Sequence, residues 1–267
     1  LERLQPQANL LAVTPQARPA LLKTLAAGPP WRAEFLAGLA RSDDPIDAIA
    51  PLFAGLNTTP ETPISEIDPW LSRLRQEGRA LQAYVTWVTR VPESQRTALG
   101  NVFDGGFEIP QEEQPGMFAW QTPGIAGATA YWSANRGTLG ENSYVVEFEG
   151  RRTPFAHLYQ ALAIPPGQWK LTWRAKALDL NTERGLIWQI YCEPSGAVLL
   201  ESPPMRGQFE WREQSAAFSV PPECQGQLLR LLIPARIPAE TAISGMLWLD
   251  GISITPAKSS DMPKTLL

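Results

Sequence analysis

The sequence predicts a two-domain protein of the α+β class, in which a small helical domain precedes an antiparallel β-sandwich. Only 4 of the 20 glycines lie before residue 98, whereas 7 of the 10 tryptophans lie after it. The first part spaces its apolar residues as helices do, and the second alternates apolar and polar residues as strands do. Nothing between the alternating segments is long enough for a crossover helix, so the sheets should be antiparallel.

Composition removes several classes of function. The 267 residues are 44% hydrophobic and carry a net charge of −4, which suits a buried core and disfavours nucleic-acid binding. The single histidine argues against histidine-based metal clusters and against a Ser-His or Cys-His hydrolase. No apolar stretch is long enough for a membrane span. The chain begins at Leu1, which leaves room for a signal peptide or an anchor upstream.

Residues 1–98 predict short helices with clear start and stop signals. Asp44-Pro45 and Asp68-Pro69 are typical helix starts, and Gly28 and Gly78 are typical ends. The last two helices, which meet at Gly78, resemble a tetratricopeptide hairpin, although no second copy is found at the 34-residue period. Two interpretations stay open: a plain helical bundle, or the end of a helical solenoid that docks a partner.

Residues 99–257 predict eight or more short strands joined by turns rich in proline and glycine, which favours a sandwich or jelly roll. Apolar residues alternate along several segments, so that their side chains share one face. The clearest sets are Tyr144, Val146 and Phe148; Trp169, Leu171 and Trp173; and Leu186, Trp188, Ile190 and Cys192. The tryptophans of these sets are assigned to the core. Residues 258–267 are expected to form a flexible tail.

The segment 101–108, Asn-Val-Phe-Asp-Gly-Gly-Phe-Glu, followed by Trp120, resembles the opening strand of galactose-binding-like jelly rolls. Bacterial carbohydrate-binding modules attached to cellulases and xylanases open in this way. Further stretches that resemble later strands of these modules are 157–160 with 166–169, 170–176 and 247–254. The resemblance covers about residues 99–257, and it implies a jelly roll that binds polysaccharide without cleaving it.

The resemblance also implies a metal site, and the two cysteines allow a disulfide. In the resembling modules the counterparts of Glu108 and Asp250 often hold a structural calcium ion, which prefers carboxylate and carbonyl oxygens. The alternative is that both are solvated carboxylates at strand ends. If the protein is exported, Cys192 and Cys224 join and close a loop of 32 residues (224 − 192). The resemblance to bacterial envelope proteins described below favours this alternative. In the cytosol they would stay two buried thiols.

In the resembling modules the outward face of one sheet forms a concave sugar groove. Aromatic side chains there pack on sugar rings, and polar side chains bond the hydroxyl groups. The residues assigned to such a groove alternate away from the core tryptophans or lie at its edge, beside the 135–137 loop: Arg174, Gln189, Tyr191, Tyr159 and Trp132. The alternatives are an ordinary polar sheet face, or a face covered by the helical domain.

Helices followed by such a jelly roll also resemble bacterial envelope and exopolysaccharide proteins. The expected function is therefore non-catalytic binding of polysaccharide at the bacterial envelope, in the periplasm or outside the cell. The alternative is a protein-interaction scaffold in an envelope secretion or assembly complex that binds no sugar. A glycosidase is a third reading, since carboxylate pairs such as Glu112 and Glu113 are present, but no phosphate loop or G-x-S-x-G elbow is found.

Overall fold

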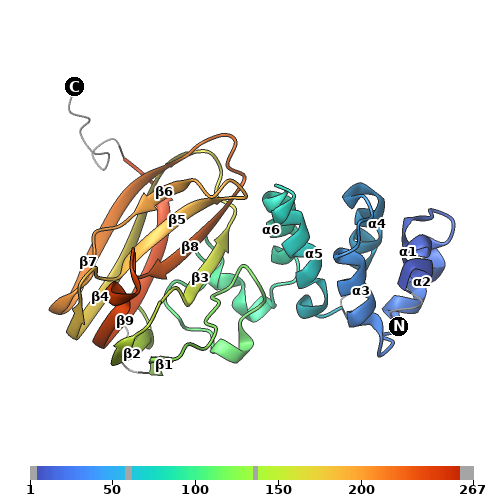
Figure 1. Cartoon of the computed structure of the whole chain (residues 1–267). Helices are drawn as coiled ribbons and strands as arrows, with labels where there is room; N and C mark the ends of the chain where they lie inside the picture. Colours follow the sequence, from blue (N-terminus) through green and yellow to red (C-terminus); the bar gives the residue numbers. More distant parts are fainter. Residues whose placement is uncertain (1–4, 58–61, 135–137, 259–267) are drawn as a thin grey trace. The chain divides into compact units, whose positions relative to one another are not determined.

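The computed structural model describes residues 5–57, 62–134 and 138–258 (Figure 1). The chain divides into two compact units. The helical unit comprises Leu1–Pro92 together with Pro115–Met117, and the sandwich unit comprises Glu93–Gln114 together with Phe118–Leu267. The division therefore falls before Glu93 rather than after residue 98. Of the predicted tail, all but Lys258 lies outside the described residues.

The helical unit consists of short helices whose apolar faces pack on one another. In the described part these are α1 (Gln5–Val13), α2 (Arg18–Ala26), α3 (Arg32–Ala40), α4 (Ile46–Asn57), α5 (Ile64–Gln76) and α6 (Ala80–Val88). Contacts join α1 to α2, α3 and α4, and join α5 to α3, α4 and α6. Phe53 and Trp70 stack at 4.5 Å between ring centroids and tie α4 to α5. The tetratricopeptide-like relation of the last pair stays a prediction.

The start of α5 differs from the predicted one. The helix begins at Ile64, so Asp68 is not its cap and Pro69 lies inside it. Glu66 in this first turn receives the Nε–H of Arg32 at 2.6 Å, and the ion pair ties the start of α5 to α3. Gly78 follows the end of α5, as predicted, and its φ of 75° is one that favours glycine. Within the described residues, none of the helices is long and apolar enough to span a membrane.

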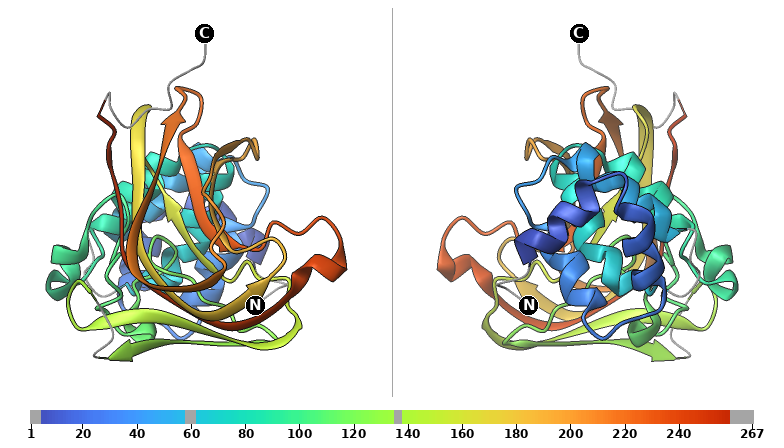
Figure 2. Two further views of the ribbon diagram at one scale, coloured as in Figure 1. Left: turned by 90° about the vertical axis from the view of Figure 1, so that its left-hand side faces the viewer. Right: turned by 90° about the vertical axis from the view of Figure 1, so that its right-hand side faces the viewer.

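The sandwich unit consists of two antiparallel sheets, as predicted. One sheet has the strand order β1-β2-β9-β4-β7, and the other has the order β3-β8-β5-β6. The strands of the first sheet are β1 (Ala128–Ala134), β2 (Asn142–Arg152), β9 (Ala242–Pro256), β4 (Gly167–Thr182) and β7 (Gly207–Val220). Those of the second are β3 (Leu158–Leu162), β8 (Gly226–Leu232), β5 (Ile187–Glu193) and β6 (Val198–Glu201). In Figure 2 the long strands β4, β7 and β9 run side by side and curve strongly.

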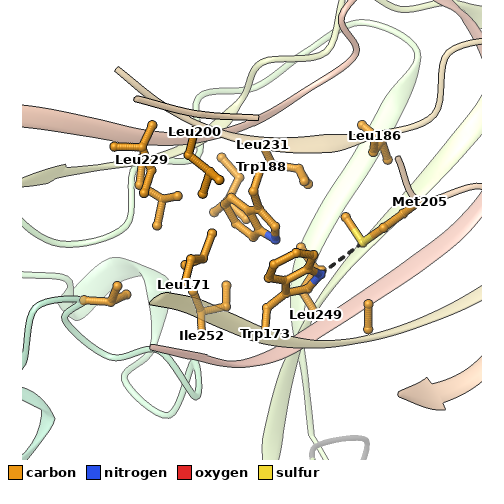
Figure 3. Close-up of a cluster of buried hydrophobic side chains, with 14 of the residues drawn as sticks. Leu171, Trp173, Leu186, Trp188, Leu200, Met205, Leu229, Leu231, Leu249 and Ile252 are labelled. Carbon is orange, nitrogen blue, oxygen red and sulfur yellow. Dashed lines mark hydrogen bonds between the residues drawn. The ribbon is translucent and has the colours of Figure 1, made fainter. Parts of the chain in front are cut away.

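The core lies between the two sheets. Figure 3 shows Trp173 of β4 and Trp188 of β5 facing each other, with the indole N–H of Trp173 donating to Met205 Sδ at 3.4 Å. Both tryptophans are fully buried, so their predicted place in the core is confirmed. Trp169 is half-buried at the margin of this core, and its indole N–H donates to the Pro165 carbonyl at 3.0 Å.

The segment 101–108 is a series of turns, and its prediction as an opening strand is wrong. Asp104 and Phe107 have φ values of 48° and 57°, which a strand cannot accommodate. The Asp104 carboxylate fixes the turns by accepting the backbone N–H of Glu108 at 2.8 Å. The segment still joins the sandwich, because the Ile252 N–H donates to the Gly105 carbonyl at 2.8 Å. Only glycine fits at Gly105, since a Cβ would lie 1.8 Å from the Ile252 carbonyl oxygen.

Candidate functional site

The residues assigned to one sugar groove lie on two different sheets. Arg174 belongs to β4 of the five-stranded sheet, whereas Gln189 and Tyr191 belong to β5, and Tyr159 to β3, of the four-stranded sheet. All four point away from the core that fills the space between the sheets, so Arg174 faces the opposite way from the other three. The prediction of a single groove for these residues is therefore wrong.

On the four-stranded sheet, Gln189 and Tyr191 interact with neighbouring protein side chains. The Nε–H and Nη2–H groups of Arg230 donate to Gln189 Oε1 at 2.9 and 2.6 Å, and Gln189 Nε2 donates to Glu201 Oε1 at 2.8 Å. The same guanidinium lies 4.7 Å from the ring centroid of Tyr191. Tyr159 is the cross-strand neighbour of Arg230. These contacts link β8, β5 and β6. They occupy both the oxygen and the nitrogen of the Gln189 side-chain amide, which gives the residue a structural role.

Trp132 packs inward, so its assignment to the groove edge is wrong. Its ring meets those of Phe107 and Tyr144 edge-on, at centroid distances of 5.6 and 5.2 Å. Successive side chains of a strand point to opposite faces, so this inward position turns the preceding Tyr131 outward. The 135–137 loop, beside which Trp132 was placed, lies outside the described residues.

The outer face of the five-stranded sheet carries two aromatic side chains in one cross-strand row. Tyr131 of β1 pairs with Val145 of β2, Val145 pairs with Trp248 of β9, and Trp248 pairs with Lys176 of β4. We call these four residues the aromatic row. Tyr131 is 37% exposed and Trp248 is half-buried, while Val145 between them has no exposed surface. The alternation of buried Leu247 and Leu249 is the sequence signal that places Trp248 outside.

Polar groups of the same face surround this row. The Tyr131 hydroxyl donates to Glu147 Oε1 at 2.5 Å, and Lys176 Nζ lies 2.8 Å from Glu210 Oε2. Arg174, one cross-strand row farther along β4, has its Nε 3.7 Å from Glu213 Oε2. The face therefore combines aromatic surface with hydrogen-bonding groups, and its two cations, Arg174 and Lys176, each lie beside a glutamate.

Asp250 lies at the end of this face as the cross-strand partner of Arg174, and Glu108 lies against the same glycine, Gly106, as Asp250 does. Both side chains border Gly106. A Cβ at Gly106 would lie 3.7 Å from Glu108 Cγ, 3.8 Å from Asp250 Oδ1 and 3.5 Å from the Leu139 carbonyl oxygen. Two residues that are distant in sequence, both chosen from the family resemblance, thus border one small cradle at Gly106, Asp250 with a carboxylate oxygen and Glu108 with its Cγ.

Both carboxylates hold the segment 138–142 in place. Asp250 Oδ2 accepts the hydroxyl of Thr138 at 2.9 Å and the backbone N–H of Leu139 at 2.8 Å. Glu108 Oε1 accepts the backbone N–H groups of Glu141 and Asn142, each at 3.0 Å. Asp250 is fully buried and Glu108 is exposed, so the first is an anchor inside the fold and the second is a solvent-exposed carboxylate that also holds the 138–142 segment.

The Asp250 carboxylate and the Leu139 carbonyl oxygen at this cradle are ligands of the kind that calcium prefers. Glu108 borders the cradle with its Cγ, and its carboxylate accepts the N–H groups of Glu141 and Asn142. Among the residues that the structure describes, no three His, Cys, Asp or Glu side chains are grouped so as to hold a metal ion. Carbonyl oxygens would therefore have to complete the ligand set of Glu108 and Asp250. Calcium at these residues stays a prediction.

Asp104, whose carboxylate accepts the backbone N–H of Glu108, is 4% exposed. Burial raises the pKa of its carboxyl group to about 6, and the hydrogen bonds from the Gln114 amide and from the backbone of Glu108 and Ile109 oppose that rise. Gln114 Nε2 donates to Asp104 Oδ2 at 2.9 Å. The group is thus titratable near pH 6 while it fixes the turns that carry Glu108.

Cys192 and Cys224 form a disulfide, as the exported alternative predicted. Their Cα atoms are 5.6 Å apart, and neither residue is appreciably exposed. The bond links β5 to the turn that precedes β8, and thereby fixes two neighbouring strands of the four-stranded sheet.

No protein-family model and no curated protein matches the chain. Solved structures match the sandwich part. The CBM22-1 xylan-binding domain of Xyn10C from Paenibacillus barcinonensis is 13% identical, with a TM-score of 0.39 over 58% of this chain and 94% of that one. A CBM4 structure is 11% identical, with a TM-score of 0.41 over 60% and 99%. TmCBM61, solved with β-1,4-galactotriose, is 12% identical, with a TM-score of 0.40 over 60% and 100%. These values are too low to place the chain in any of these families.

Proposed function

We propose that the chain binds a neutral polysaccharide without cleaving it, through the outer face of the five-stranded sheet. The aromatic row is the observation that carries this proposal. Tyr131 and Trp248 lie two strands apart, which corresponds to roughly 10 Å. That spacing is close to the span of a disaccharide in an extended chain. Each aromatic ring offers an apolar surface to the C–H face of one sugar, and its polar atom stays available for hydrogen bonding.

The polar side chains beside the row supply hydrogen bonds to sugar hydroxyls. Glu147 accepts the Tyr131 hydroxyl through one carboxylate oxygen and offers the other to the ligand. Arg174 and Lys176 donate from β4. Because each of these cations already pairs with a glutamate, the face favours a neutral glycan over a uronic acid polymer.

Binding without catalysis fits the carboxylates of this face. A glycosidase places one protonated and one ionised carboxyl group on either side of the scissile bond. Glu147, Glu210 and Glu213 instead each contact a tyrosine, lysine or arginine of the same face. They are arranged to hold side chains in position and to contact a ligand.

We further propose that the protein works at the bacterial envelope, in the periplasm or outside the cell, in the production or export of exopolysaccharide. The buried Cys192–Cys224 disulfide supports an oxidising compartment. A calcium ion held by Glu108 and Asp250 would stiffen the 138–142 segment next to Arg174, and so would keep the end of the binding face in place. These two residues bind and orient; no chemical step is assigned to them.

Binding is tested by calorimetry with hexasaccharides of β-1,4-linked glucose, xylose, mannose and galactose, with polygalacturonate as the charged comparison. We expect one neutral series to bind, and Trp248→Ala to weaken it about 30-fold or more. Tyr159→Ala, on the other sheet, is the matched control and should bind as the wild type does. A wild type that binds none of the four series contradicts the proposal, and release of reducing sugar would replace it with catalysis.

A further inference from the structure

One extra residue is inserted into β4, and it disturbs the pairing with both neighbouring strands at the same place. Against β9, the pair Leu178–Met246 is followed by Asn181–Ser244, so two β4 residues face one β9 residue. Against β7, Ala177–Phe209 is followed by Leu180–Gly207. Asp179 lies at the centre of this bulge with a φ of 48°, a left-handed value that is unfavourable for aspartate.

Glycine in the neighbouring strand makes room for this bulge. Gly245 has a φ of 96°, and a Cβ there would lie 2.2 Å from the Asp179 carbonyl oxygen. No other residue type fits this position. A bulge in a central strand that is matched by a glycine next to it is a built feature, and such bulges commonly re-aim a side chain.

The bulge opens a hollow of about 480 Å³ between β4 and β7. Its lining residues are Asp179, Leu180, Asn181, Thr182, Arg206, Gly207 and Gln208. Asp179, Asn181 and Gln208 are exposed, and together they present carboxylate and amide groups. The Arg206 side chain donates a hydrogen bond of 3.1 Å to the Glu183 carbonyl oxygen. Amide, carboxylate and guanidinium groups match sugar hydroxyls, which both donate and accept hydrogen bonds.

The hollow continues the face that bears the aromatic row. Along β9 the outward residues run from Trp248 through Met246 to Ser244, and their β4 partners are Lys176, Leu178 and Asn181. Leu178 is 42% exposed, so an apolar surface lies between the row and the hollow. From Tyr131 to Asn181 the path crosses three strand spacings and four residues along β9, roughly 20 Å in all. That distance exceeds the length of a trisaccharide.

We propose that the hollow at Asp179, Asn181 and Gln208 is a second contact area for the same polysaccharide, so that the site binds an internal stretch of chain longer than a trisaccharide. This rests on the proposed function of the aromatic row. Sugars at the row stack on Tyr131 and Trp248, those in between pass over Leu178, and those at the far end exchange hydrogen bonds with the hollow.

The test compares trisaccharides and hexasaccharides of the neutral series that the wild type binds. The hexasaccharide should bind about tenfold more tightly than the trisaccharide. Asn181→Ala combined with Gln208→Ala should remove most of that difference and leave trisaccharide affinity unchanged. Ser215→Ala, at an exposed residue of β7 that pairs with Thr172 and lies outside the hollow, is the matched control. Asp179→Gly removes the carboxylate and keeps the left-handed backbone, which glycine adopts without strain, so it isolates the side chain.

The outcomes separate the two proposals. If Trp248→Ala weakens both sugars but the Asn181→Ala, Gln208→Ala and Asp179→Gly variants bind the hexasaccharide as the wild type does, the second contact area is wrong and the aromatic row stands. Equal wild-type affinity for both lengths also contradicts the second contact area. If the wild type binds no hexasaccharide, both proposals fail together.

Discussion

Arg174 and Tyr191 lie on opposite outer faces of the sandwich, since Arg174 projects from β4 of the five-stranded sheet and Tyr191 from β5 of the four-stranded sheet. Arg174 is close to the aromatic row and has its Nε 3.7 Å from Glu213, at a side-chain exposure of 38%. Tyr191 lies against the guanidinium of Arg230. A ligand bound to the row therefore reaches the first residue and not the second.

This placement predicts that Arg174→Ala weakens glycan binding about tenfold, because one charged donor is lost. Tyr191→Ala should leave the affinity unchanged. Calorimetry of both variants against the sugar that the wild type binds measures the difference. A larger loss for Tyr191→Ala than for Arg174→Ala would move the site to the four-stranded sheet.

Tyr131 allows the ring and the hydroxyl to be tested separately. Tyr131→Phe keeps the aromatic face and removes the hydroxyl that donates to Glu147, so it should cost about 1 kcal/mol of binding free energy. Tyr131→Ala removes the ring as well and should cost about 2 kcal/mol or more. Calorimetry with one hexasaccharide gives both values. Equal losses for the two variants would mean that the ring does not contact the sugar.

Alternation along the strands predicted the core correctly, because period-two patterning fixes which side chains face inward. Trp173 and Trp188 are buried as that pattern requires. Alternation cannot tell which sheet a strand joins, and so Arg174 was grouped with Gln189. The strand order depends on pairings between distant segments, such as β4 with β9, which leave no mark on either segment alone.

Local turns and helix ends were the other features that could not be predicted from the sequence. The segment 101–108 has the glycines of a close-packed turn, but its course is set by the Asp104 carboxylate and by the contact of Gly105 with Ile252. The first turn of α5 is tied to α3 by the Arg32–Glu66 ion pair, whose partners are far apart in sequence. The shared cradle of Glu108 and Asp250 likewise could be expected only from the family resemblance.

Calcium binding at Glu108 and Asp250 predicts a higher melting temperature in calcium than in chelator, because a ligand that binds only the folded state stabilises it by mass action. Glu108→Gln should abolish the difference. Glu112→Gln, a change at an exposed carboxylate, should preserve it. Differential scanning calorimetry in both buffers provides the comparison. Identical wild-type melting temperatures would leave the two carboxylates as anchors of the 138–142 segment alone.

Loss of the disulfide should destabilise the sandwich unit. The Cys192–Cys224 bond closes a sequence separation of 32 residues, for which the chain-entropy model gives about 3–4 kcal/mol. We expect the Cys192→Ser, Cys224→Ser double variant to lose about that much free energy of unfolding in urea. Reductant should lower wild-type stability by a similar amount and leave the double variant unchanged. Two free thiols in the intact mass of oxidised protein would refute the bond.

The raised pKa of Asp104 predicts that this residue's contribution to the stability of the sandwich unit falls as the pH rises from about 4 to about 6. Burial raises the folded-state pKa from 3.8 to about 6, so in that window the folded state holds a proton that the unfolded state has released. The favourable contribution is complete below pH 4 and is lost as the pH passes 6. Its size is on the order of 2–3 kcal/mol at most.

Asp104→Asn should flatten this dependence, and it should also lower stability at every pH because an amide cannot accept all three N–H donors that the carboxylate accepts. Burial also raises the pKa of Asp68, in the helical unit, to about 6, so both wild type and variant are measured on an Asp68→Asn background. Urea unfolding from pH 4 to pH 7 then reports the Asp104 contribution. If the stability of the Asp104 protein relative to the Asp104→Asn variant rises with pH across this window, Asp104 is ionised more readily in the folded state, and its hydrogen bonds outweigh its burial.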